Sequence, residues 1–216
     1  MYLLRYGFVR YVIRVIKVGG NELDSALFCE GLAQAVARAE QKVVVVHGGG
    51  RAISAQQTAL GLPVVKVAGL RVTDAAALAV VVGVLCGNTN KSLVAALRNA
   101  GVNAVGLSGV DGGILRCSKM QHPGGDLGLV GQVEQVDPQL LRVLLLAGFT
   151  PVLAPIGVGD GGDELGWADN FDETVASLTA AGVELDAGVL EGAPHMFRMD
   201  WSTLGPWLEK VQGTSR

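Results

Sequence analysis

Unbroken runs of apolar residues, rich in valine and isoleucine, recur along the first part of the chain. They occupy residues 11–20, 42–50, 102–108 and 149–158, and the first two end in consecutive glycines. Apolar runs without alternation are typical of strands buried on both faces of a parallel sheet. Segments with helical spacing lie between them, such as the one from Phe28 to Ala39. The pattern therefore predicts an α/β fold with a mostly parallel sheet and helices on both faces.

Turn and capping residues predict the remaining elements. Ala68-Gly69 divides residues 62–73 into a small hairpin, and Asp74 can cap the helix that follows toward Cys86. A separate helix is expected from Lys91 to Ala100. The other expected elements are hairpin strands at 113–117 and 129–136, a helix after Asp137-Pro138 that ends at Gly148, a loop at 159–170, a helix at 172–181, a strand at 183–190 and a short helix at 203–211.

Two glycine turns follow the first two predicted strands, at Gly19-Gly20 and at Gly48 to Gly50. Parallel strands share a direction, so both turns are expected at the same edge of the sheet. Glycines between a strand and a helix expose backbone N–H groups, and the helix N-terminus adds partial positive charge, which together favour an anion. Lys17 can place an ammonium group at that edge. The alternative is that both segments are only tight strand-to-helix turns.

Composition and charge narrow the function. Hydrophobic residues make up 50% of the 216 residues and charged residues 17%, which is enough for a substantial core. The net charge is −3 and no basic stripe is present, which argues against nucleic acid as a partner. Three widely spaced cysteines form no CxxC pair, which is typical of a reducing cytoplasm. Arginines interrupt the apolar N-terminus, and no run of ~18 apolar residues exists, so neither a signal peptide nor a membrane helix is expected.

Seven segments together resemble the amino acid kinase family, with the acetylglutamate kinases as the closest match. The resemblance covers residues 12 to about 158 and is specific because all seven occur in the family's order and spacing. The segments read VIKVGG, VVVVHGGG, GLRVTD, GNTNKSLVAAL, GVNAVGLSGVDGG, LGLVGQVEQVDPQLL and PVLAPIGV.

This resemblance implies a three-layer αβα sandwich and a concrete reaction. The family members in question transfer the γ-phosphoryl group of ATP, which is bound with Mg²⁺, to the side-chain carboxylate of N-acetyl-L-glutamate in arginine biosynthesis. The carboxylate is already ionised and is itself the nucleophile, so positioning and charge neutralisation are the main tasks of the protein. The resemblance also implies a cytoplasmic homo-oligomer. One extra methylene separates N-acetylglutamate from N-acetylaminoadipate, and the sequence does not distinguish these two substrates.

The family's functional residues match six positions of this chain. Lys17 matches the lysine that stabilises the transferring phosphoryl group, and Gly19 and Gly20 match phosphate-binding glycines. The substrate-binding residues that match are Gly49, Gly50 and Arg71, the last of which would clamp the α-carboxylate through its guanidinium fork. No metal-ligating residue is assigned.

The resemblance ends near residue 158, where the family continues with an Asn-x-Asn-Ala-Asp motif and a nucleotide-binding half. We therefore expect an acyl-acceptor domain at 1–158 and a divergent tail at 159–216. The tail resembles the end of an α/β-hydrolase esterase, with His195 and Asp169 or Asp172 at the positions of the triad histidine and acid. No G-x-S-x-G segment is present to supply a nucleophile, which leaves an esterase as the weakest hypothesis.

Two hypotheses then remain for the whole chain. The first is an acetylglutamate kinase, whose activity we expect to be very weak without the usual nucleotide-binding half. The second is a catalytically inactive module that binds an N-acyl amino acid or regulates a true kinase.

Overall fold

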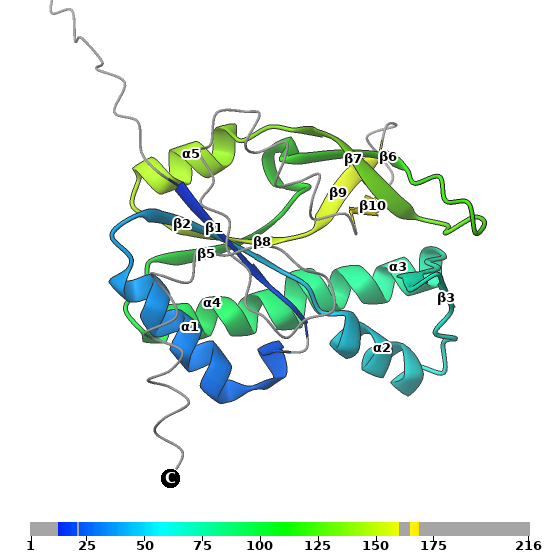
Figure 1. Cartoon of the computed structure of the whole chain (residues 1–216), viewed down its shortest axis with the longest axis horizontal. Coiled ribbons are helices and arrows are strands. Elements are labelled where there is room, and N and C mark those ends of the chain that lie inside the picture. Colours follow the sequence, from blue (N-terminus) through cyan, green and yellow to red (C-terminus); the bar gives the residue numbers. More distant parts are fainter. Residues whose placement is uncertain (1–12, 21, 160–164, 169–216) are drawn as a thin grey trace, which may run out of the picture.

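The computed structural model describes residues 13–20, 22–159 and 165–168. Four parallel strands form its central sheet, in the order β1 (Ile13–Val18), β2 (Lys42–His47), β8 (Thr150–Ala154) and β5 (Ala104–Ser108). Figure 1 shows this sheet between a layer of helices on one side and α5 (Gln139–Leu146) on the other. The predicted parallel sheet and three-layer αβα arrangement are confirmed.

Alternate residues of β1 and β2 build the core on the two faces of the sheet. Val15 and Val44 pack against Leu141 and Leu145 of α5. Their neighbours face the opposite layer, which α1 (Ala26–Arg38) and α4 (Asn90–Asn99) form. That second core contains Ile16, Val18, Leu32, Ala33, Val36, Val43, Val45, Leu93 and Leu97. Burial on both faces explains why these strands read as unbroken apolar runs.

A second, closed sheet of four short strands adjoins the central one. It contains β6 (Leu115–Lys119), β7 (Val130–Val136), β9 (Ile156–Gly159) and β10 (Leu165–Ala168). The predicted hairpin of β6 and β7 is confirmed by their antiparallel pairing.

Two predictions near this sheet were wrong. The single strand expected at 149–158 is divided, because β8 ends at Ala154 and β9 begins at Ile156 in the other sheet. Pro155 lies between them, and proline cannot donate to a continuing ladder. Residues 165–168, expected in a loop, form β10 and pair with both β7 and β9. β9 is the preceding strand, but β7 is distant in sequence, so local glycine content gave a misleading signal.

Local turn chemistry was predicted well. β3 (Lys66–Val67) and β4 (Leu70–Arg71) form the expected hairpin, with Ala68 at φ 49° and Gly69 at φ 88° in its turn. Asp74 caps α3 (Ala75–Val82), since its Oδ1 accepts a hydrogen bond from the Ala77 N–H at 2.8 Å. Other elements are α2 (Gly50–Ala59) and the 3₁₀ turns η1 (Glu22–Asp24) and η3 (Asp111–Gly113).

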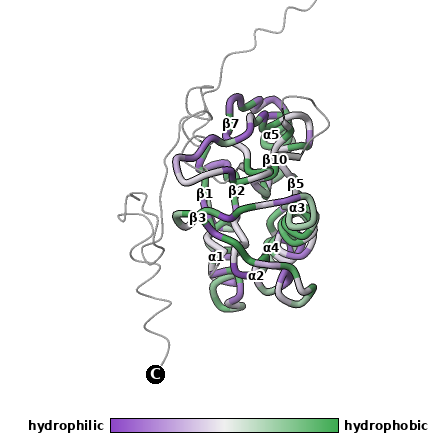
Figure 2. The backbone as a smooth tube through the Cα atoms, turned by 90° about the vertical axis from the view of Figure 1, so that its right-hand side faces the viewer, coloured by the Kyte–Doolittle hydropathy of each residue, from purple (hydrophilic) through white to green (hydrophobic). Residues whose placement is uncertain are grey.

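The two helices expected between Asp74 and Gly101 are one continuous helix. A π-helical segment, η2 (Gly83–Thr89), joins α3 to α4, so the chain is helical from Ala75 to Asn99. By length and composition alone this helix could cross a membrane, contrary to the expectation that no such segment exists. In this fold Leu85 and Leu97 are fully buried against the core. Figure 2 shows how hydrophobic residues concentrate along α3.

Candidate functional site

The two glycine turns lie in direct contact at the carboxyl edge of the central sheet. Val18 and His47, the last residues of β1 and β2, are register partners, and the Gly48 N–H donates to the Val18 carbonyl at 2.9 Å. A Cβ on Gly20 would lie 2.7 Å from the N and Cα of Gly49 and 2.8 Å from the N of Gly50. The expected common edge is therefore confirmed, and Gly20 is required because the turns approach so closely.

Backbone nitrogens gather where the turns meet. Gly49 is the N-cap of α2 and Gly50 is its first residue, so the first N–H groups of this helix have no intrahelical partner. The helix N-terminus also contributes partial positive charge at this point. The arrangement suits an anion bound between the two turns.

The glycines of this edge differ in what surrounds them. A Cβ on Gly49 would lie 2.6 Å from Cδ2 of the buried Leu85, and one on Gly19 would meet the Glu22 carboxylate. A Cβ on Gly50 would have no atom within 4 Å. Packing within the chain thus accounts for Gly49, whereas the space at Gly50 is open.

Arg71 lies beside the second turn, although it comes from the β3–β4 hairpin. Its side chain is buried, with 3% of the residue exposed. One Nη donates to the side-chain oxygen of Gln57, and the other donates to the Gly50 carbonyl at 3.1 Å and to Ser54 Oγ at 2.7 Å. All three acceptors belong to α2, and none carries a formal charge. Because three hydrogen bonds join it to one helix, the guanidinium has a fixed orientation.

Lys17 belongs to β1, is half-buried and pairs in register with Val46. It precedes the first turn by two residues, near the end of β1, the strand that Figure 1 labels. Five of the six predicted site residues thus lie at two adjacent strand ends and at the start of α2, and the sixth, Arg71 of β4, reaches the Gly50 carbonyl with its guanidinium. Their roles toward ligands remain predictions.

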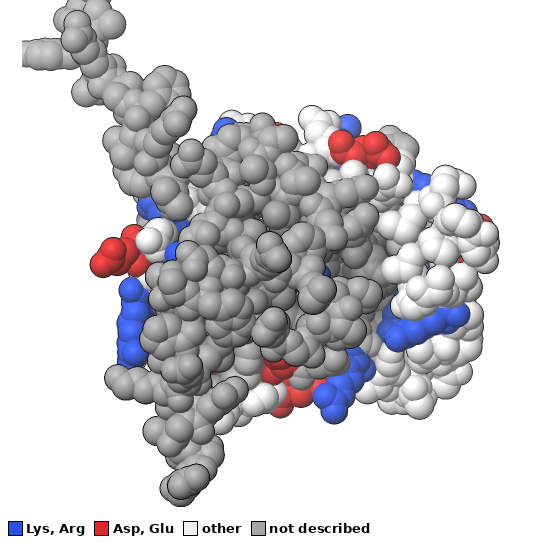
Figure 3. Space-filling view, viewed as in Figure 1, with Lys and Arg blue, Asp and Glu red and all other residues white. Residues whose placement is uncertain are grey.

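An exposed ion pair links the segments that follow the two turns. Arg51 of α2 and Asp24 of η1 are 3.3 Å apart, N to O, with side chains 64% and 51% exposed. An exposed pair contributes only about 0–1 kcal/mol. Acidic and basic side chains are otherwise scattered around the edge of the face in Figure 3.

A buried polar network behind the second turn was missed from the sequence. His47 is 1% exposed, its Nδ1 lies 3.1 Å from the Gly48 carbonyl, and its Nε2 lies 3.0 Å from Asn90 Nδ2. Asn90 in turn contacts the Val152 carbonyl at 3.0 Å and accepts from Lys91 Nζ at 2.9 Å. The segments containing His47 and Asn90 both contribute to the family resemblance, but nothing local in the sequence connects residues 43 positions apart.

Burial lowers the pKa of His47, and the nearby charge of Lys91 lowers it further, while the hydrogen bond to the Gly48 carbonyl opposes the shift. The ring is therefore neutral near pH 7. A charged imidazolium would also lose the hydrogen bond from Asn90, because both of its ring nitrogens are donors.

We predict that this histidine makes stability depend on pH. The unfolded chain binds a proton at His47 below a pKa of about 6.5, while the folded chain resists protonation. Stability is therefore fully present above about pH 6.5 and falls as the pH falls toward the lowered folded pKa, by at most ~1.4 kcal/mol per pH unit. Urea unfolding between about pH 5 and 7.5 measures the slope, and His47→Asn should reduce it. Equal slopes in the two proteins would contradict the assignment of a neutral buried ring.

Gly106 of β5 makes room for the network. A Cβ at this position would overlap Asn90 Oδ1 and lie 2.7 Å from Lys91 Nζ. Because several hydrogen bonds hold the Asn90 amide, it cannot move aside without losing partners.

We therefore predict that Gly106→Ala lowers the free energy of unfolding by about 1–3 kcal/mol. Gly83→Ala is the matched control, since Gly83 is exposed within a helix and its Cβ would meet nothing within 4 Å. The control should be neutral or stabilising by up to about 1 kcal/mol. A destabilisation of the same size in both variants would refute the steric argument.

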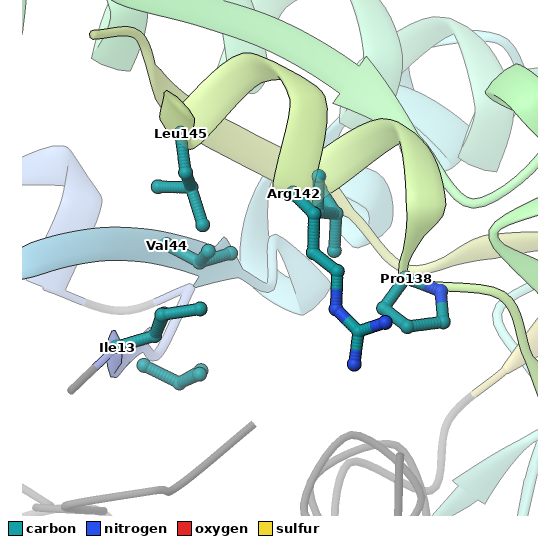
Figure 4. A pocket seen from close by; sticks show the side chains of 7 residues that line it. Ile13, Val44, Pro138, Arg142 and Leu145 are labelled. Atoms are coloured by element: carbon teal, nitrogen blue, oxygen red, sulfur yellow. The ribbon is translucent and has the colours of Figure 1, made fainter. Parts of the chain in front are cut away.

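A small apolar groove lies at the other end of β1, away from the glycine turns. Figure 4 shows Ile13, Val44 and Leu145 around it, with Arg142 and Pro138 at its side. Ile13 is the first residue of β1, whereas the first glycine turn follows its last residue. This groove is consequently not part of the candidate site.

Three other expectations can be compared with the described residues. Cys29, Cys86 and Cys117 are free thiols. Within residues 13–20, 22–159 and 165–168, no cluster of three or more His, Cys, Asp or Glu side chains could hold a metal ion. Asp169, Asp172 and His195 lie outside the residues that the structure describes, as do the helices and strand expected after residue 170.

Comparison of sequences connects this geometry to known proteins. The profile of the Amino acid kinase family matches residues 13–191. An acetylglutamate kinase from Roseiflexus sp. (strain RS-1) is 48% identical over 167 residues, which cover 77% of this chain and 63% of that protein. An acetylglutamate kinase from Chloroflexus aggregans is 46% identical over 166 residues, covering 77% and 65%. The chain thus spans a little under two thirds of the length of these relatives.

Solved structures agree on the fold. The protein smu.665 from Streptococcus mutans UA159 is 28% identical with a TM-score of 0.66, over 81% of this chain and 69% of that one. An N-acetylglutamate synthase from Neisseria gonorrhoeae has a TM-score of 0.65 at 22% identity, over 85% of this chain and 42% of that one, which supports the fold alone.

The esterase-like interpretation of the tail is not borne out. The family match continues to residue 191 and so includes more than half of the segment 159–216.

Proposed function

Because this chain belongs to the amino acid kinase family, we propose that it transfers the γ-phosphoryl group of ATP to the side-chain carboxylate of N-acetyl-L-glutamate. The observation that carries the proposal is the contact between the two glycine turns, with the Arg71 guanidinium held against the carbonyl of Gly50. Its relatives named acetylglutamate kinase, at 46–48% identity, support this substrate.

Each of the candidate site residues has a separate role in the proposed reaction. Arg71 binds the α-carboxylate of the acceptor, since a guanidinium can donate two parallel hydrogen bonds to a carboxylate. Acceptor binding then places the distal carboxylate near the open space at Gly50. The backbone N–H groups of the two turns, with Lys17, stabilise the negative charge on the phosphoryl group as it moves.

No general base is needed in this proposal. A carboxylate with an ordinary pKa is ionised at neutral pH and attacks the γ-phosphorus directly, forming an acyl phosphate and releasing ADP. Mg²⁺ enters with ATP and neutralises charge on its phosphates, so the protein needs no resident metal cluster for this role.

The test is hydroxylamine trapping of the acyl phosphate by the purified chain with ATP, Mg²⁺ and N-acetylglutamate. Turnover that requires both substrates supports the proposal, and the rate predicted from the sequence is very low. Calorimetric titration with each ligand separates the alternatives, because acceptor binding without turnover would identify a binding module instead. N-acetylaminoadipate is a useful competitor, since one methylene changes affinity by only ~1–3 kcal/mol.

We also propose that the chain acts in the cytoplasm as a homo-oligomer. Three free thiols are typical of a reducing compartment such as the cytoplasm, where the proposed substrate ATP is also present. Sedimentation equilibrium of the purified chain tests the oligomeric state.

Gly49 and Gly50, two of the three glycines of the second turn, provide a test of ligand approach. Gly50→Ala places a methyl group in open space, so the fold should be unaffected or slightly more stable, by up to about 1 kcal/mol. We predict that the same variant weakens acceptor binding by at least about tenfold, as expected where a Cβ enters the ligand's space. Unchanged affinity would remove Gly50 from the site.

Gly49→Val should behave differently. Its Cβ would press on buried Leu85, so we expect a loss of stability of about 1–3 kcal/mol as well as weaker binding. Thermal unfolding of both variants distinguishes the packing role of Gly49 from the proposed ligand role of Gly50.

A further inference from the structure

The buried network of His47 and Asn90 has no part in the reaction as described above, although it adjoins the second glycine turn. His47 ends β2, and Asn90 begins α4 and is fully buried. Their ring and amide are 3.0 Å apart, and the other ring nitrogen of His47 is 3.1 Å from the Gly48 carbonyl.

The neighbours of Asn90 fix the orientation of its amide. The Nδ2 atom lies 3.0 Å from the Val152 carbonyl oxygen, and the Oδ1 atom lies 2.9 Å from Lys91 Nζ. A flipped amide would set an oxygen against a carbonyl and an NH₂ group against an ammonium, and neither pair can hydrogen bond. Asn90 Nδ2 is therefore a donor to His47.

This donor determines the tautomer of His47. Its Nε2 must accept from Asn90, so the ring proton is on Nδ1. From Nδ1 the proton is donated to the carbonyl of Gly48. The imidazole thus accepts a hydrogen bond from α4 through Nε2 and donates one to the glycine turn through Nδ1.

A hydrogen bond to the Gly48 carbonyl also orients the next N–H group. The peptide joining Gly48 to Gly49 is planar and trans, so its C=O and N–H point in opposite directions. The nitrogen of Gly49 lies where the two turns meet, 2.7 Å from the place that a Cβ of Gly20 would take. We infer that His47 and Asn90 are positioning residues that hold the Gly48–Gly49 peptide with its N–H directed toward the anion site between the two turns.

The surrounding helix has features that suit this role. The π-helical segment η2 ends at Thr89, immediately before Asn90, and its Leu85 side chain packs against Gly49. π-Helical turns are rare and are found frequently at functional sites. The irregular segment therefore contacts the turn directly, and the Asn90 side chain that follows it reaches the same turn through His47.

Two substitutions of His47 separate positioning from simple filling of space. The side-chain nitrogen of asparagine takes the place of the histidine Nδ1, whereas that of glutamine takes the place of Nε2. His47→Asn can thus still donate to the Gly48 carbonyl, and His47→Gln cannot, although glutamine fills more of the buried volume. A positioning role predicts that asparagine replaces histidine better, and a space-filling role predicts the reverse.

The first measurement uses the ligand-free full chain. Nitrogen-15 NMR should show His47 protonated at Nδ1 only, and the ¹³C′ shift of Gly48 should be retained in His47→Asn and changed in His47→Gln. Protonation at Nε2, or the same Gly48 shift in both variants, would overturn the inference.

The second measurement rests on the proposed kinase function. We expect kcat to fall at least about tenfold further in His47→Gln than in His47→Asn, with similar KM values for N-acetylglutamate. Equal kcat values, or a slower asparagine variant, would overturn the inference. If the wild-type chain shows no turnover, the proposed function fails, while the ligand-free measurement still decides the positioning role.

Discussion

Replacing Lys17 with alanine is expected to lower the rate of acyl phosphate formation by about 10²- to 10³-fold. The γ-phosphoryl group carries negative charge throughout its transfer, and the site must neutralise this charge in a fixed geometry. Lys17 precedes the first glycine turn on β1, so its ammonium is the nearest side-chain cation to that turn along the strand. The loss should appear mainly in kcat, because the charge interaction strengthens in the transition state.

Lys42→Ala is the matched control for this experiment. Lys42 lies at the other end of β2, where its Nζ donates to the Leu145 carbonyl at 2.5 Å. Its removal deletes an ammonium group from the same sheet at the edge away from the turns, and kcat should stay within about threefold of wild type. Similar rate losses in both variants would show that Lys17 acts through general electrostatics or stability.

Local sequence signals predicted the elements whose conformation depends on neighbouring residues. The Ala68-Gly69 turn, the Asp74 cap and the strand ends at Val18 and His47 each depend on a few neighbouring residues. The common edge of the two glycine turns followed from these strand ends and from the shared direction of parallel strands.

Features decided by distant contacts were not predictable in the same way. The strand β10 pairs with the preceding strand β9, but it also pairs through Trp167 with Val130 of β7, which lies in a distant part of the chain. Likewise, only the folded arrangement brings Asn90 to His47. A polar residue in an apolar helix carries no local sign of the partner that satisfies it.

The site residues illustrate the same division. The resemblance to the family supplied Arg71, but the sequence did not indicate that its guanidinium is held by Gln57, Ser54 and the Gly50 carbonyl. Those contacts join the β3–β4 hairpin to α2. They give the arginine a fixed orientation, which would reduce the entropy lost if it binds a carboxylate as proposed.

Arg71→Ala is expected to weaken binding of N-acetylglutamate by about 2–5 kcal/mol, or roughly 30- to 5,000-fold in Kd. The buried guanidinium would form a charge pair with the α-carboxylate, and its truncation would leave that carboxylate unpaired in the site. Isothermal titration calorimetry measures the change directly. Arg71→Lys should lose much of the same affinity, because an ammonium group cannot donate the two parallel bonds of a guanidinium.

Stability must be measured alongside, since Arg71 also bonds to α2. Loss of these hydrogen bonds should lower the free energy of unfolding by about 1–3 kcal/mol in Arg71→Ala. Gln57→Ala provides the comparison, because it removes one of these contacts and keeps the guanidinium. If Gln57→Ala reduced ligand affinity as much as Arg71→Ala, the effect would come from the fold of this region. Full affinity in both Arg71 variants would show that the α-carboxylate is bound elsewhere.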